Sequence, residues 1–107
     1  MIEDDNETWL LGAANGVIEK KTTLGYASLG PVECLTYCLW VADYGMRNAG
    51  DLVAASDLHS SFIADARAAA AELGLPHSMA AFSLSATELE RRYFELFDDL
   101  CQEIRAA

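Results

Sequence analysis

The chain has 107 residues, 52% of them hydrophobic, which is enough for one packed domain over residues 1–107. Seventeen acidic residues against seven basic ones give a formal net charge of −10. This charge repels nucleic acids and anionic lipids, so we expect no direct binding to nucleic acid or membrane. No apolar run approaches the roughly 18 residues of a membrane span, and the acidic start does not resemble a signal peptide. We therefore expect a cytoplasmic protein.

The first half of the chain predicts two helices. Residues 6–22 follow acidic capping residues and end at Lys20 and Lys21, the charges that a helix dipole favours at those two ends. Residues 23–30 form a glycine-punctuated connector. Pro31 then opens a helix that continues to about Asn48, since proline is favoured at the first helical position. This helix is apolar around much of its circumference, which predicts a central place in the fold.

The second half predicts two further helices. Residues 52–73 have apolar side chains at helical spacing up to Gly74, a conventional stop, and residues 75–84 form a linker. Ser85 with Glu88 three residues later is a capping box, and the apolar spacing after it continues to about Ile104. No segment alternates with period two. We therefore expect an all-α fold, a compact bundle of four to five helices.

The last predicted helix has an acidic face opposite its apolar one. On a helical projection this face comprises Glu88, Glu95, Asp98, Asp99 and Glu103. Arg91 and Arg92 are expected to pair with Glu95 and Glu88 at a spacing of four. Neighbouring acids on a helix stand roughly 5–6 Å apart and offer a basic protein an array of negative charge, as a DNA backbone does. An ordinary solvated helix face is the alternative interpretation.

A second candidate surface lies on the predicted central helix, where Tyr37, Trp40, Asp43 and Tyr44 share one stripe. Tyrosine and tryptophan combine a large apolar area with a polar group, which suits a protein-binding surface. Alternatively, a neighbouring helix covers this stripe.

The thiols and histidines do not form a recognised catalytic or metal-binding motif. Cys34 and Cys38 lie one helical turn apart and, with Cys101 and a histidine, offer four zinc ligands, but no Cys-x-x-Cys is present. We expect buried, reduced thiols, no metal and no cofactor. His59 falls on the apolar seam of helix 52–73, and Asp65 is expected on another face. With no nucleophile elbow and no phosphate-binding glycine loop, we expect no enzyme activity.

Residues 35–73 resemble a bacterial domain family of acidic, all-helical, DNA-mimic-like proteins. The resemblance rests on the aromatic segment 37–44, on Arg47-Asn48-Ala49-Gly50, on a long helix ending at Leu73-Gly74, and on a final helix with the pattern from Phe94 to Leu100. Asn48 and Gly50 match the family pattern Asn-Gly-Gly-Phe, whereas Ala49 and Asp51 depart from it. The resemblance implies a helical fold and a non-enzymatic role with a protein partner.

These features predict a non-enzymatic domain that binds a protein with a basic surface, in one form a DNA-mimic-like inhibitor of a nucleic-acid-binding protein. One alternative is an immunity or antitoxin-like inhibitor of a toxin. Another is a structural homo-oligomer in which the stripe of Tyr37, Trp40 and Tyr44 closes a homodimer.

Overall fold

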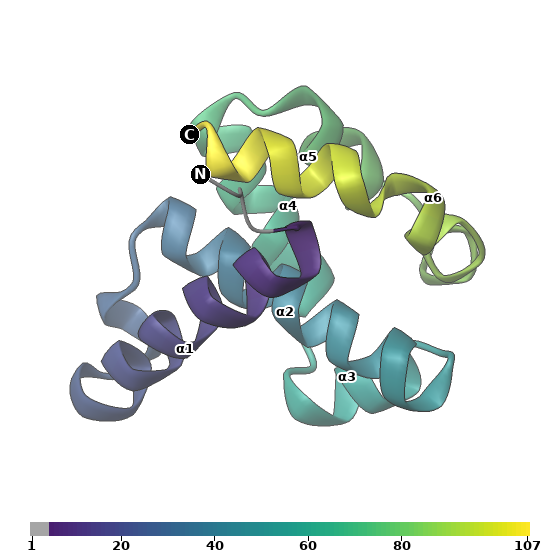
Figure 1. The fold of residues 1–107 in the computed structure, drawn as a ribbon. Coiled ribbons are helices and arrows are strands. Elements are labelled where there is room, and N and C mark those ends of the chain that lie inside the picture. Colours follow the sequence, from purple (N-terminus) through teal and green to yellow (C-terminus); the bar gives the residue numbers. More distant parts are fainter. Residues whose placement is uncertain (1–4) are drawn as a thin grey trace.

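A computed structural model describes residues 5–107 (Figure 1) and confirms the all-α class, with no strand in that range. The elements are α1 Asn6–Leu24, the 3₁₀ turn η1 Tyr26–Ser28, α2 Pro31–Ala49, α3 Val53–Leu58, α4 Phe62–Leu73, α5 Pro76–Ala81 and α6 Ala86–Arg105. Asp4, one of the predicted capping residues, lies outside the described residues. Asp5, another of them, caps α1 as predicted, because its carboxylate accepts the Thr8 N–H at 2.7 Å. None of the helices in residues 5–107 has the length and apolarity needed to cross a membrane.

Helix α2 lies in the middle of the bundle and packs against α1, α3, α4 and α6 (Figure 1). Leu35, Leu39 and Ala42 are fully buried along it, which confirms the predicted central position. Helix α4 presents small buried side chains to α2, and these allow the two helices to approach closely. The central helix therefore fixes the positions of the other elements.

The prediction of one continuous helix over residues 52–73 is wrong. The chain leaves the helix at His59, which has an extended backbone (φ −152°, ψ 95°), and resumes a helical path at Phe62. The break places both Ala55 of α3 and Phe62 of α4 in the core. Local propensity favours a continuous helix here, and burial on two separate elements overrides that preference.

Helices α2 and α3 make close backbone contact at Gly45. A Cβ atom at this position would lie 2.9 Å from the Asp51 carbonyl oxygen and 3.0 Å from the Ala55 amide nitrogen. The neighbours are backbone atoms, which do not move aside easily. Only glycine allows this approach.

The predicted linker over residues 75–84 contains the short helix α5. Gly74 adopts a left-handed conformation (φ 68°), and the Leu75 N–H donates to the Ala70 carbonyl, which closes the end of α4. Pro76 then begins α5, which packs against α4 and α6. Six residues are too few for a hydrophobic period to be detected in the sequence.

Helix α6 lies across the bundle, and its C-terminal half lies beside the start of α1 (Figure 1). The predicted cap is confirmed, since the Glu88 N–H donates to Ser85 Oγ at 3.2 Å. Its buried face includes Leu89, Tyr93 and Phe97, at the predicted helical spacing. Of the acids that the sequence singled out, Glu95, Asp98 and Asp99 are exposed on α6, and Glu103 is only partly exposed.

Candidate functional site

Two of the five predicted acids on α6 are paired with arginines of the same helix. Glu88 lies 2.7 Å from an Arg91 nitrogen, and Glu95 lies 3.2 Å from an Arg92 nitrogen. The predicted spacing of four is wrong: both pairs are three residues apart, a distance that an arginine on a helix reaches equally well. The hydrogen bond from Arg91 holds the pKa of Glu88 below its usual value.

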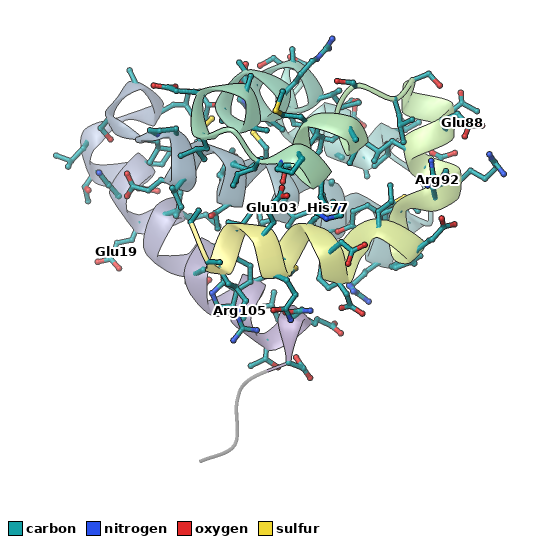
Figure 2. The ribbon with its side chains drawn as sticks, turned by 90° about the horizontal axis from the view of Figure 1, so that it is seen from above. Glu19, His77, Glu88, Arg92, Glu103 and Arg105 are labelled. Atoms are coloured by element: carbon teal, nitrogen blue, oxygen red, sulfur yellow. The ribbon has the colours of Figure 1, made fainter. Side chains whose placement is uncertain are left out.

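Glu103 is directed into the fold and holds the start of α5. Its two carboxylate oxygens accept the backbone N–H groups of His77 and Ser78, each at 2.8 Å. Figure 2 shows Glu103 and His77 side by side between the two helices. The first N–H groups of a helix have no partner within the helix, so Glu103 supplies one from α6. Glu103 therefore makes structural contacts that join α6 to α5.

The remaining two acids, Asp98 and Asp99, differ in their surroundings. Asp98 accepts a hydrogen bond from Asn6 Nδ2 at 2.9 Å, which joins α6 to the start of α1. Asp99 is exposed and has no hydrogen-bond or ion-pair partner within residues 5–107. The five acids therefore do not form one uncompensated negative face, and Asp99 is the member left open to a partner.

Asp99 borders a groove of about 450 Å³ between α5 and α6. Its lining comprises Pro76, His77, Ala80, Ala81, Leu84, Arg92, Glu95, Leu96, Asp99 and Leu100. Most of these side chains are apolar, and the polar ones come mainly from α6. The groove thus combines an apolar surface with carboxylates at its edge, an arrangement that suits an amphipathic segment of a partner.

The aromatic stripe on α2 is largely covered. Tyr37 and Asp43 are each only 4% exposed, so they offer almost no accessible surface to a partner. The Tyr37 ring stacks on Trp40, with the centroids 6.0 Å apart, and contacts His59 edge-on. Trp40 is half-buried, and Tyr44 alone of the four is exposed. The interpretation that neighbouring elements cover the stripe therefore holds for its two buried members.

Asp43 has a structural role. It accepts a hydrogen bond from the Tyr93 hydroxyl at 2.7 Å and another from Arg47 Nε at 2.9 Å. Arg47 in turn lies over the Phe97 ring of α6. This network, buried at Asp43 and Tyr93, joins α2 to α6.

A polar cluster that the sequence did not predict surrounds Cys34. The break after α3 brings His59 Nε2 to 2.8 Å from Asp65 Oδ2, so the expectation that these two lie on different faces is wrong. Tyr26, in the predicted connector, donates its hydroxyl proton to Asp65 at 2.8 Å and lies 3.2 Å from Cys34 Sγ. The sequence offered Cys34 and His59 as candidate residues. No spacing rule connects either of them to Tyr26.

The cysteines differ in exposure. Cys38 and Cys101 are buried, as predicted, but Cys34 is partly exposed, so the prediction of a buried thiol is wrong at that position. Within residues 5–107, no group of three or more histidine, cysteine, aspartate or glutamate side chains is arranged to hold a metal ion.

Comparison with protein-family models, curated proteins and solved structures gives no match. The resemblance of residues 35–73 to DNA-mimic-like proteins therefore stays a prediction.

Proposed function

We propose that the domain binds a basic, amphipathic segment of a protein partner in the α5–α6 groove and acts by occupying that segment. The observation that carries the proposal is the unpartnered carboxylate of Asp99 beside apolar groove residues such as Leu96 and Leu100. Apolar side chains of the segment would pack in the groove, and a lysine or arginine would approach Asp99. The net charge of −10 would increase the rate at which a basic partner arrives.

A segment that contacts nucleic-acid phosphates has the required chemistry, because it is basic and commonly helical. Direct contact with nucleic acid does not fit a chain of this charge.

The test uses a synthetic amphipathic helix with leucines on one face and lysines on the other, and its binding is measured by fluorescence anisotropy. We expect binding that weakens as salt rises from about 0.05 M to about 0.5 M, because surface charges are screened over this range. A peptide with glutamates in place of lysines should not bind. Binding that is insensitive to salt, or equal for both peptides, would contradict the proposal.

Two variants of the groove distinguish the contribution of charge to peptide affinity from the contribution of shape. Asp99→Asn should weaken binding about two- to five-fold, the effect of losing one exposed ion pair. Ala80→Phe, which places a ring in the groove without a change of charge, should weaken it roughly ten-fold or more. Glu19→Gln is the matched control: it removes one exposed, unpartnered charge from α1, at the opposite side of the molecule from Glu88 and Arg92 (Figure 2).

The proposal fails if Glu19→Gln weakens binding as much as Asp99→Asn. The peptide would then respond to overall charge rather than to the groove. It also fails if Ala80→Phe leaves the affinity unchanged.

A further inference from the structure

A second pocket, separate from the α5–α6 groove, contains a cysteine thiol. It has a volume of about 370 Å³ and lies between η1, the start of α2 and α4. Its lining comprises Tyr26, Leu29, Pro31, Cys34, Asp65, Ala68, Ala69 and Glu72. Cys34 is partly exposed here, in the first turn of the 19-residue helix α2. The positive end of a helix dipole stabilises a thiolate at such a position.

The Tyr26 hydroxyl lies beside the Cys34 sulfur and belongs to a polar cluster around Asp65. Tyr26 Oη lies 3.2 Å away and donates its proton to Asp65 Oδ2. Asp65 has two further contacts, with His59 Nε2 at 2.8 Å and with Ser61 Oγ at 2.9 Å. It therefore keeps neighbouring donors when the Tyr26 hydroxyl turns toward a thiolate at Cys34. The Tyr26 hydroxyl can thus donate its proton either to Asp65 or to a thiolate at Cys34.

The pKa of Cys34 is lowered to about 6. Hydrogen bonding from Cys38 is the largest influence, and Tyr26 and His59 act in the same direction, whereas burial and the charge of Asp65 oppose them. The pKa values of the other two thiols are raised rather than lowered. The hydrogen bond to Cys34 and burial raise the pKa of Cys38, and burial raises that of Cys101 to about 12.

We propose that Cys34 is a reactive thiol that takes neutral alkyl hydroperoxides as its substrates in this pocket. The Cys34 thiolate attacks the terminal oxygen of the peroxide, a sulfur–oxygen bond forms, and the oxygen–oxygen bond breaks. The sulfur is oxidised by two electrons to a sulfenic acid, and the peroxide is reduced to an alkoxide. The alkoxide takes a proton from solvent, which received the thiol proton, so one thiol and one hydroperoxide give a sulfenic acid and an alcohol.

The residues that line the pocket determine the chemical class of the substrate. Leu29, Pro31 and the two alanines of α4 offer an apolar wall for an alkyl group. Asp65 and Glu72 place negative charge on the same pocket, which disfavours anionic oxidants and disulfides. A neutral peroxide with an apolar substituent fits both features.

The sulfenic acid should persist in the folded protein. Cys38 is one turn along the same helix, and a disulfide needs the two Cβ atoms at about 3.5–4.5 Å, closer than residues four apart stand on a regular helix. We expect peptide mass spectrometry after treatment with cumene hydroperoxide and dimedone to find the trapped adduct at Cys34. An intramolecular disulfide between Cys34 and Cys38 as the main product would overturn this part of the proposal.

The wild-type protein provides the first test without any substitution. At pH 6, Cys34 should react about ten-fold faster than the cysteine of an unstructured peptide, because its larger thiolate fraction outweighs its lower intrinsic nucleophilicity. The order should reverse near about pH 7.5, where the ratio of thiolate fractions no longer outweighs the lower nucleophilicity. Cys34 should react faster with neutral dithiodipyridine than with dianionic dithiobis(nitrobenzoate). The ratio of these two rates should be larger for Cys34 than for the peptide cysteine. A Cys34 rate equal to that of the peptide at pH 6, or equal labelling of Cys101, would overturn the proposal.

Variants then locate the cause. Tyr26→Phe should shift the rate profile of Cys34 to higher pH, whereas Cys101→Ala, remote from the pocket, should not. Glu72→Gln should raise the rate with the dianionic disulfide and leave the neutral one nearly unchanged, with Glu19→Gln as the matched charge control. If Glu19→Gln has the same effect as Glu72→Gln, overall charge rather than the pocket sets the selectivity, and the assignment of neutral substrates to the pocket fails.

Discussion

Replacing Glu103 by glutamine tests whether this acid is structural. The carboxylate accepts two backbone N–H groups of α5, at His77 and Ser78, both at 2.8 Å. Glutamine keeps one acceptor oxygen and turns an amide nitrogen, which is a donor, toward the other N–H. A hydrogen bond to a charged group contributes about 1.5–3 kcal/mol, and the partial exposure of Glu103 favours the lower end of that range. We therefore expect Glu103→Gln to lower the free energy of unfolding by about 2 kcal/mol.

For a domain of this size, that loss lowers the melting temperature by roughly 10 °C. Urea unfolding followed by helical circular dichroism measures the free energy, and a thermal scan measures the midpoint. Asp99→Asn is the matched control, since it removes the same charge from the same helix and no intramolecular bond, and it should change stability by less than about 0.5 kcal/mol. A Glu103→Gln variant within about 0.5 kcal/mol of wild type would refute the structural role. So would an equal loss in Asp99→Asn.

Three further predictions concern packing, a buried hydrogen bond and pH. Gly45→Ala should lower the free energy of unfolding in urea by about 1–3 kcal/mol, because the added Cβ would meet backbone atoms of Asp51 and Ala55. Gly12→Ala is the control: its Cβ would meet nothing within 4 Å, so this variant should be neutral or stabilising. Tyr93→Phe removes a buried hydrogen bond to Asp43 and should cost about 2 kcal/mol, whereas an unchanged urea midpoint would contradict this. Burial raises the pKa of Asp65, but hydrogen bonds from its neighbours outweigh burial and hold it below the usual value. The stability advantage of wild type over Asp65→Asn should therefore be constant above about pH 5 and shrink as the pH falls below about 4, and an advantage that grows in acid would contradict this.

The long helices could be predicted because their signals are local. Pro31, Gly74 and Ser85 mark ends that depend on a few neighbouring residues, and the hydrophobic spacing of α6 extends over its whole length. The break at His59 has no such signal. The segment around it lacks glycine and proline, and the chain departs from the helix there because Phe62 packs in the core. That reason lies in other elements, so a window of sequence does not contain it.

The candidate site likewise has some features with a local sequence signal and others that depend on the whole fold. The sequence identified the acidic residues of α6 by type and by face, but it did not identify their partners. The donors to Glu103 are backbone N–H groups of a helix that was predicted to be a linker. Tyr26 meets Cys34 and Asp65 across eight and thirty-nine residues of sequence, and tyrosine in a connector has no distinctive pattern. Contacts of this kind depend on the assembled fold.

The distribution of charge changes the meaning of the acidity. The net charge is −10, yet on α6 the acids Glu88, Glu95, Asp98 and Glu103 already have donors within the protein. A partner that depended on charge alone would have to displace those donors, at a cost similar to what it gains. An apolar segment placed in the groove gains area without breaking them, and Asp99 then adds one ion pair. Binding energy should therefore come mainly from the groove, while the net charge sets how fast a basic partner arrives.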